Sequence, residues 1–355
     1  MPAFLELFQK VDLESKVVFS VQLSNLLNAG VPLRASLGTL ENQTENRRLR
    51  EVIGRVLRDV EAGASFSEAL HRHPSIFSNL FVSLVRAGEA AGKLDSVLSR
   101  LALLTEQEAD LRQKIRGALF YPAILLTAGL LVSLYIVTFL IPQFAEIFLR
   151  AGIALPLPTE LLYRFGTGVR QFWHFGLLSA ALLSVAASLY GGTAQGRIHF
   201  DRLKLMLPLA GPLFRKAAIT RFSRTLGLLV ESGVPILESL EIAREVISNE
   251  VLGRVIGNVR QAVEKGEKIS AALRTSGEFP PDVIQMIAVG EETGGLDQML
   301  AKIADFYDRS IGYTVRKLTT VLEPLLLGVL GGLVGFMMAS MLLPIFDMMK
   351  ILRRP

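Results

Sequence analysis

Cysteine is absent from the 355 residues of this chain. Its absence excludes a disulfide scaffold, a cysteine nucleophile and any thiolate metal site. Charge is also scarce, since charged residues make up 20% of the chain against about a quarter in typical soluble domains. Hydrophobic residues reach 50%, and the mean hydropathy is +0.41. This balance disfavours an ordinary soluble enzyme.

Three long apolar runs account for the high hydropathy. The first covers residues 117–141 and contains no charged residue. A helix of that length spans roughly 37 Å, enough to cross the apolar core of a bilayer. A second run, 175–190, is shorter and richer in alanine and serine, and a third, 321–343, is interrupted only by Glu323. We expect these internal runs to insert in the membrane, because the first twenty residues are too charged to form a cleavable signal peptide.

The runs divide the chain into domains, spans and connections. We expect charged domains at 1–116 and 193–318, transmembrane helices at 117–141, 174–192 and 319–345, an external loop at 142–173 and a short external tail at 346–355. Cations lie beside the domain ends of these spans, at Arg112, Lys114, Arg116, Arg197, Arg202, Lys204, Arg316 and Lys317. The positive-inside rule therefore places both domains in the cytoplasm, although Lys350, Arg353 and Arg354 in the tail oppose this orientation.

The chain contains an internal repeat. Phe19-Ser20-x-x-Leu23 followed by Gly30-Val31-Pro32 returns as Phe222-Ser223-x-x-Leu226 followed by Gly233-Val234-Pro235, at an offset of 203. Further on, Gly88-Glu89-x-x-Gly92-x-Leu94-Asp95 returns as Gly290-Glu291-x-x-Gly294-x-Leu296-Asp297, at an offset of 202, and the same offset relates Pro122 to Pro324. Each repeat is thus a charged domain followed by its own membrane helix, and the middle span returns the chain to the starting side.

The spacing of apolar residues inside each repeat is helical. Phe19, Leu23, Leu26 and Leu27 recur at intervals of three and four, and no stretch alternates as a strand would. Gly30 and Gly233 stand where a helix would end in a left-handed residue, each followed by a proline that can begin the next helix. We therefore predict an all-α membrane protein with two bundles of about six helices each.

The repeated Gly-Glu-x-x-Gly-x-Leu-Asp motif has two interpretations. In the first, Gly92 and Gly294 end one helix while Asp95 and Asp297 N-cap the next. In the second, Glu89 and Glu291 hold a partner or a neighbouring helix through a charge-assisted contact. The structural interpretation is favoured, because a capped turn accounts for most of these residue types.

Two features of the third span suggest contacts. Glu323 precedes Pro324 at the expected start of the helix, where the interface and the helix dipole both tolerate an anion, and we expect an interfacial or interdomain contact there. A glycine strip follows, formed by Gly328, Gly331, Gly332 and Gly335. Glycines four residues apart let helices approach closely, which predicts packing against another transmembrane helix of this chain or of a second copy.

Signals for chemistry are weak. Residues 88–94 resemble a phosphate loop, but they have one residue too few between the glycines and Leu94 in place of a magnesium ligand. His71 and His73 point to different helix faces, so a metal pair is not expected. Acidic residues flank the arginines near Arg48, which favours a solvated face over nucleic-acid binding. We expect no catalytic, cofactor or metal site.

Taken together, the duplicated motifs and Tyr121-Pro122 at the first span resemble the type II secretion system protein F and type IV pilus platform family, over nearly the whole chain. The resemblance implies two cytoplasmic six-helix bundles on three transmembrane helices, forming a multi-pass platform in the bacterial inner membrane. It also implies a hexameric assembly ATPase, other inner-membrane assembly proteins and pilins or pseudopilins as partners, contact with membrane lipid, a homo-oligomer and no catalysis.

The sequence departs from this family at two places. The N-terminal extension of many members, which the resemblance links to partner contacts, is nearly absent because Phe19 arrives early. Some secretion members bind calcium through an acidic pair, and Ser99 and Leu103 at the matching positions cannot supply it, so no calcium is expected there. A transporter built from a duplicated unit remains an alternative function, although the first span offers only Thr127, Ser133, Tyr135 and Thr138 as polar groups.

Overall fold

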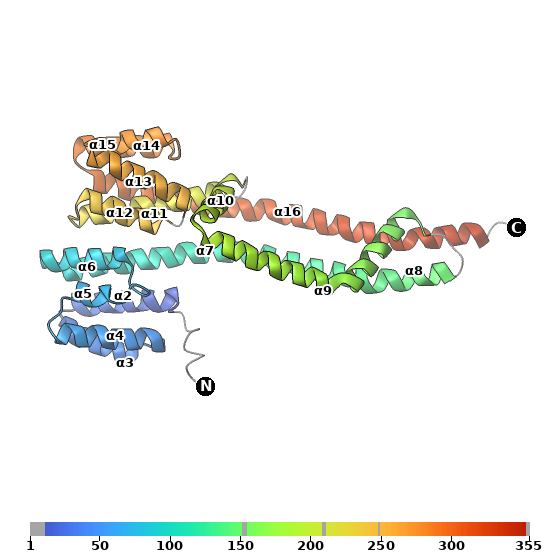
Figure 1. Ribbon diagram of the computed structural model, residues 1–355, viewed down its shortest axis with the longest axis horizontal. Helices are drawn as coiled ribbons and strands as arrows, with labels where there is room; N and C mark the ends of the chain where they lie inside the picture. The colour runs from blue at the N-terminus through green and yellow to red at the C-terminus, as the bar shows by residue number, and fades with distance from the viewer. Residues whose placement is uncertain (1–10, 151–154, 208–210, 248, 353–355) are drawn as a thin grey trace. The chain divides into compact units, whose positions relative to one another are not determined.

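The computed structural model describes residues 11–150, 155–207, 211–247 and 249–352. The described residues form helices joined by short turns, and no strand occurs among them (Figure 1). The chain divides into two compact units. The bundle unit comprises Met1–Lys114 and Ile198–Gly312, and the membrane unit comprises Ile115–Arg197 and Tyr313–Pro355. The predicted all-α class is confirmed.

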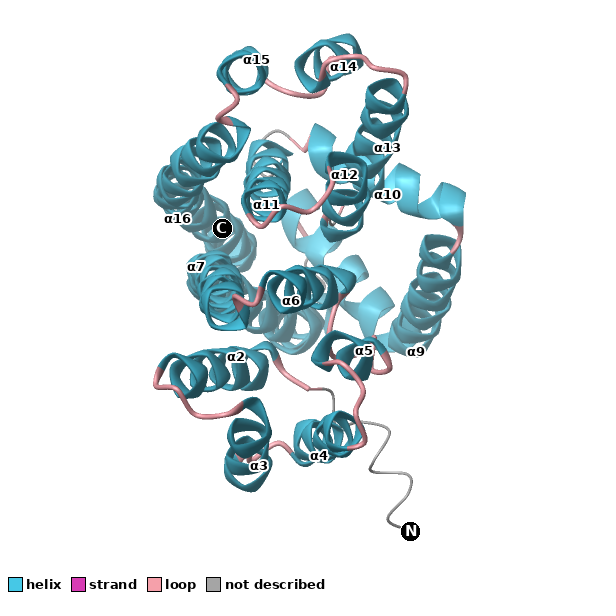
Figure 2. Ribbon diagram, turned by 90° about the vertical axis from the view of Figure 1, so that its left-hand side faces the viewer, coloured by secondary structure: helices cyan, strands magenta, loops and turns pink. Residues whose placement is uncertain are grey.

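The first repeat forms six helices that enclose a common core (Figure 2). They are α2 (Leu13–Asn28), α3 (Leu33–Gln43), α4 (Arg47–Glu61), α5 (Phe66–His71), α6 (Asn79–Ala91) and the first part of α7 (Leu94–Tyr135). Leu23, Leu37, Phe66 and Leu98 are fully buried there. The helical spacing of apolar residues read from the sequence therefore identifies the face that each helix turns to the core.

The second repeat builds the same arrangement. Its helices are α11 (Gly211–Glu231), α12 (Ile236–Val246), α13 (Glu250–Glu264), α14 (Ile269–Ser276), α15 (Pro281–Thr293) and the first part of α16 (Leu296–Leu352). Leu98 and Leu101 of α7 are matched by Leu300 and Ile303 of α16, and all four are buried. Residues related by the offset of 202 therefore occupy equivalent buried positions in the two bundles.

The turn after the first helix of each repeat follows from its glycine. Gly30 has φ +80° and Gly233 has φ +79°. The N–H of Val31 donates to the carbonyl of Leu26 at 3.0 Å, and the N–H of Gly30 to that of Leu27 at 2.9 Å. This pair of bonds is a Schellman motif, which satisfies carbonyls that the ending helix leaves free. The predicted left-handed residues are confirmed at both positions.

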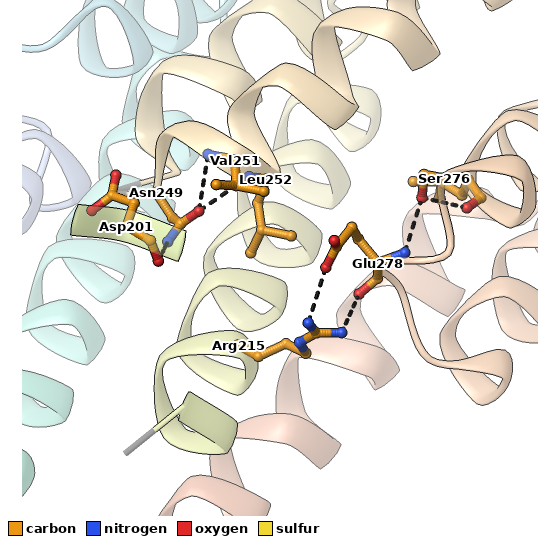
Figure 3. Close-up of polar contacts among 8 residues, drawn as sticks. Asp201, Arg215, Asn249, Val251, Leu252, Ser276 and Glu278 are labelled. Carbon is orange, nitrogen blue, oxygen red and sulfur yellow. Dashed lines mark hydrogen bonds and ion pairs between the residues drawn. The ribbon is translucent and has the colours of Figure 1, made fainter. Parts of the chain in front are cut away.

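A further helix, α10 (Ala194–Met206), is fastened to the second bundle by polar contacts (Figure 3). The Asn249 side chain accepts hydrogen bonds from the N–H groups of Val251 and Leu252 at 3.0 and 3.1 Å, and so N-caps α13. Its amide nitrogen donates to the carbonyl of Asp201 on α10 at 3.3 Å, and the Asp201 carboxylate accepts from the N–H of Glu250 at 2.8 Å. One short segment therefore sets both the start of α13 and the position of α10.

A second polar contact holds the start of α11. The Arg215 guanidinium donates to the Glu278 carbonyl at 3.1 Å and to its carboxylate at 2.9 Å (Figure 3). Glu278 lies in the turn between α14 and α15. The two bonds fix α11 against that turn, because a guanidinium that donates to two acceptors has little rotational freedom.

Three helices of the membrane unit are long and apolar enough to cross a bilayer. The first extends α7 through a π-helical turn, η1 (Ile136–Leu140), into α8 (Ile141–Arg150). The second is α9 (Leu157–Gly192), and the third is the later part of α16. The expectation of three membrane helices is confirmed by length and composition.

The segment at 142–173, expected as an external loop, is largely helical. Helix α8 runs to Arg150, and α9 begins at Leu157. Pro156 is the N-cap of α9, and Pro158 lies in its first turn. Proline is favoured there because its missing N–H has no helical partner in any case. The position of this segment outside the membrane stays a prediction.

Candidate functional site

The repeated motif is a structural joint inside each bundle. In the first repeat the Glu89 carboxylate of α6 accepts hydrogen bonds from the N–H groups of Phe66 at 2.6 Å and of Ser67 at 3.0 Å. These groups begin α5, a helix of six residues. The N-cap Ser65 and Glu68 form a capping box that satisfies the remaining donors. Glu89 therefore anchors a short neighbouring helix by its N-terminus, as the second interpretation of the motif allowed.

The second repeat uses the same joint. Glu291 of α15 accepts from the N–H of Ile269 at 2.5 Å and from the N–H of Ser270 at 3.1 Å. The Ser270 hydroxyl donates to the same carboxylate at 2.5 Å. Helix α14 lacks a capping side chain of its own, because its N-cap residue is Lys268. Glu291 is thus the principal acceptor at the start of α14, and a role in binding a separate partner remains a prediction for both glutamates.

The other motif residues also have structural places. Gly92 and Gly294 adopt φ +64° and +74° at the ends of α6 and α15, as predicted. Asp95 and Asp297 are not N-caps, which corrects the first interpretation. The helices begin one residue earlier, at Leu94 and Leu296, so each aspartate lies in the first helical turn. An anion is stabilised there by the N-terminal end of the helix dipole.

Glu323 is not at the start of a helix. Helix α16 begins at Leu296, so Glu323 and Pro324 lie well inside it, and the favourable helix-dipole effect assumed from the sequence does not apply. The side chain is exposed, and no hydrogen bond or ion pair joins it to another residue that the structure describes. An interfacial or interdomain contact through Glu323 stays a prediction.

The glycine strip contacts no other part of the described chain. A Cβ added at Gly328, Gly331, Gly332 or Gly335 would meet no atom within 4 Å. The side of α16 that packs within the membrane unit carries Leu333, Met337, Ser340 and Met341 instead. At 100° per residue, these side chains lie nearly opposite the glycines. Packing against another helix of this chain is therefore not what the structure shows for the strip.

One close helix approach within the membrane unit occurs at Gly129 of α7, where an added Cβ would lie 2.5 Å from the Leu330 side chain of α16, and a closer one occurs at Gly166. The sequence had singled out neither glycine. A Cβ built on Gly166 of α9 would lie 2.0 Å from the Val137 carbonyl oxygen of η1. That carbonyl is left free by its own helix, because the N–H of Ile141 donates to Ile136 and Pro142 has no N–H. The proline explains the π-helical turn, and the glycine lets α9 lie directly against the exposed carbonyl.

A buried polar contact joins α9 to α16. Thr159 and Ser340 are 3% and 0% exposed, and the Thr159 hydroxyl donates to the Ser340 carbonyl. The Ser340 hydroxyl in turn donates to the Phe336 carbonyl at 2.8 Å. Hydrogen bonds of this kind hold membrane helices together because hydrocarbon offers no alternative partner. The contact fixes the first turn of α9 on the third span.

The two bundles share a core, which the sequence analysis did not foresee. Leu229, Val234 and Ile242 of the second repeat belong to the hydrophobic cluster of the first. At the rim, Arg100 of α7 forms an ion pair with Glu231 of α11 at 2.7 Å. Asn79 of α6 donates a hydrogen bond to Glu245 of α12 at 2.8 Å. The bundle unit is therefore one body made of two repeats.

A signal for this interface was present in the differences between the repeats. Leu228, Glu231 and Val246 lie at or beside the interface, and their counterparts in the first repeat are Asn25, Asn28 and Gln43. The three counterparts are exposed. At Leu228 and Val246, an apolar residue in one copy and a polar residue in the other indicates that the position is covered in one copy only.

A cavity of about 450 Å³ lies beside this interface. Phe19, Phe77 and Phe81 line its apolar part, and Lys16 and Glu245 are among its polar residues. The Lys16 ammonium donates to the Ile76 carbonyl at 2.7 Å, and burial lowers the pKa of Lys16. Among the described residues, no three or more His, Asp or Glu side chains gather as metal ligands would. The arrangement can pack and bind, and it presents no reacting group beside a base.

Comparison with known proteins agrees with this architecture. The model of the family described as type II secretion system (T2SS), protein F matches residues 19–142 and again 222–344. The type IV pilus assembly protein PilC of Thermus thermophilus is 45% identical, over 96% of this chain and 84% of that protein. PilC of Myxococcus xanthus is 36% identical over 96% and 82% of the two chains. The type II secretion system protein F of Xanthomonas campestris pv. campestris is 35% identical over 94% and 82%.

Proposed function

This chain belongs to the type II secretion system protein F family, and we propose that it is the inner-membrane platform of a type IV pilus or type II secretion machine. In this role it couples a hexameric cytoplasmic assembly ATPase to the insertion of pilins or pseudopilins. The platform carries out no catalytic step itself. Its function is mechanical, and other inner-membrane assembly proteins bind it.

The observation that carries this proposal is the continuity of two helices. Helix α7 runs from the buried Leu98 of the first bundle into an apolar span, and α16 does the same from Leu300 of the second. The shared core makes the two bundles one body. A push or rotation applied to that body by an ATPase would reach the membrane through both helices, each of which continues past an internal proline, Pro122 in α7 and Pro324 in α16.

We also propose that both bundles face the cytoplasm. The cations that flank the bundle ends of the spans support this orientation, and so does the need of an ATPase partner for ATP. Of the three opposing cations, Lys350 lies on α16, and Arg353 and Arg354 lie outside the described residues. Membrane lipid then covers α9, whose apolar span is exposed along its whole length.

Binding of the assembly ATPase tests coupling and orientation together. The purified ATPase of the same organism is added to inside-out and to right-side-out vesicles that contain the full-length protein, and bound ATPase and ATP turnover are measured. We expect binding and a changed turnover with inside-out vesicles alone, and none with vesicles that lack the protein. Binding to right-side-out vesicles alone would mean that the bundles face the outside of the cell. No binding to either at micromolar ATPase would contradict the coupling role and make ion flux through the vesicles the next measurement.

The glycine strip is proposed to pack against a second copy of this chain. Because the chain has no cysteine, Gly332→Cys and Val334→Cys each introduce a single thiol. The two positions lie two residues apart, so they point to nearly opposite sides of α16 at nearly the same depth. In oxidised membranes we expect at least a fivefold higher yield of disulfide-linked dimer from Gly332→Cys. Equal yields, or a higher yield from Val334→Cys, would show that the strip is not a dimer contact.

A further inference from the structure

One face of α7 is covered by the second bundle. Arg100 pairs there with Glu231, and Leu104 packs against the shared core together with Leu228 and Val246. Gln107 lines the groove between α7 and α11. The covering helices, α11 and α12, present the apolar Leu228 and Val246 at the centre, the Glu231 carboxylate beside Arg100 and, in the same groove, the cation Arg224. The first repeat therefore shows which partner this helix face accepts.

The same face exists on α16 of the second repeat. The offset of 202 relates Arg100, Leu104 and Gln107 to Lys302, Phe306 and Arg309, which we call the α16 face. The buried residues of the two helices match at this offset, since Leu98 and Leu300 are both 0% exposed. The three side chains therefore project from α16 in the direction in which their counterparts project from α7.

The α16 face has no covering helix within the described chain. Phe306 is 53% exposed, and Lys302 and Arg309 are exposed. Neither cation forms a hydrogen bond or ion pair with another residue that the structure describes. Phe306 makes its ring contact with the adjacent Tyr307. An aromatic ring between two unpaired cations is thus left on the surface where the first repeat half-buries Leu104.

The two faces of a second copy that correspond to the covering helices do not fit the α16 face. In each copy, the face of α11 and α12 already covers α7. The equivalent face of α2 and α3 carries Asn25, Asn28 and Gln43, which offer neither apolar surface nor carboxylates. A lipid surface is also excluded, because Phe306 lies fifteen residues before the third apolar run at Val321, roughly 22 Å along the helix.

We propose that the α16 face binds a helix of another protein, one that presents apolar side chains flanked by Glu or Asp. The arrangement would repeat the contact between α11 and α7, with Phe306 in the place of Leu104 and Lys302 in the place of Arg100. The second cation, Arg309 in the place of Gln107, strengthens the selection for an acidic rim. This surface goes beyond the proposed function, which names partners and assigns none of them to a face.

Photocrosslinking in living cells tests the proposal. p-Benzoylphenylalanine replaces Phe306 in the full-length protein, and in a matched control it replaces Phe214, which is 42% exposed on α11. The crosslinked peptides are identified by mass spectrometry. We expect the probe at position 306 to give a peptide from another protein, helical in spacing and with carboxylates beside the crosslinked residue, and the probe at position 214 to give no such peptide.

Reversing the charges of the α16 face tests whether the crosslinked protein is held by those charges or is only nearby. With Lys302→Glu and Arg309→Glu together, the crosslink yield at position 306 should fall at least fivefold. The control pair Lys265→Glu and Arg274→Glu, two exposed cations elsewhere on the second bundle, should leave the yield unchanged. Adducts with lipid or with a second copy of this chain, a yield no higher than that at position 214, or insensitivity to charge reversal would each overturn the proposal. None of these outcomes bears on ATPase binding to vesicles, so the two proposals fail independently.

Discussion

Gly166→Ala should destabilise the membrane unit, whereas the same change two residues away should not. The added Cβ at position 166 would lie 2.0 Å from the Val137 carbonyl oxygen, so α9 must move away from η1. Overpacking of this kind costs typically about 1–3 kcal/mol. We expect the midpoint of thermal unfolding in detergent to fall by several degrees. Unfolding is monitored by the fluorescence of Trp173, the single tryptophan of the chain, which also lies on α9.

Gly168→Ala provides the matched control. Gly168 lies on the same helix, and an added Cβ there would meet no atom within 4 Å. Alanine is favoured over glycine inside a helix by up to about 1 kcal/mol, so this variant should be as stable as the parent protein or slightly more stable. The two substitutions are therefore expected to change the midpoint of thermal unfolding in opposite directions. If both raise the midpoint, α9 does not lie against the Val137 carbonyl.

Removal of the Glu291 carboxylate is expected to loosen α14. Glu291→Ala deletes the acceptor of the Ile269 and Ser270 N–H groups and leaves both without a partner in a partly buried place. Losing hydrogen bonds to a charged group at such a site costs about 2–3 kcal/mol. Hydrogen exchange of the Ile269 and Ser270 amides should speed up, and the urea midpoint of the full-length protein in detergent should fall.

The adjacent Glu292 controls for the loss of a negative charge. Its carboxylate is exposed and lies 3.7 Å from Lys268, a surface ion pair that contributes less than about 1 kcal/mol. Glu292→Ala should leave the exchange of the α14 amides unchanged. Similar exchange rates in the two variants would mean that Glu291 does not anchor α14. If Glu291→Ala instead keeps normal exchange and loses ATPase binding, the glutamate is a partner contact.

Local signals in the sequence predicted much of the fold. Gly30 and Gly233 end helices in the left-handed conformation because glycine adopts it without strain, and each neighbouring proline suits a helix start. The prolines of 142–173 also suit a helix start, for the same physical reason. Pro158 lies in the first turn of α9 instead of ending a helix, and periodicity cannot tell a helix start from a helix end where the residues on both sides are apolar.

Contacts between distant residues were harder to predict. The motif pointed correctly to Glu89 and Glu291, yet the N–H groups that they bind lie about twenty residues away and carry no side-chain signature. The approach of Gly166 to Val137 depends on a carbonyl that Pro142 leaves free, and a single sequence does not show which helix meets it. The contact between the bundles was readable only by comparing the repeats, at positions such as Leu228 and Asn25.

The difference between the repeats has a further consequence for how such a chain could have grown. The contact between the repeats joins two different surfaces, the α11 and α12 face of one repeat and the α7 face of the other. Identical repeats joined in this way could add without limit, because each new repeat would leave one of the two surfaces open. Here the α2 and α3 face of the first repeat carries Asn25, Asn28 and Gln43, which cannot take the role of Leu228, Glu231 and Val246. Those polar residues prevent a further repeat from packing there. The series stops at two repeats on that side, and among the described residues the α16 face of the second repeat stays uncovered.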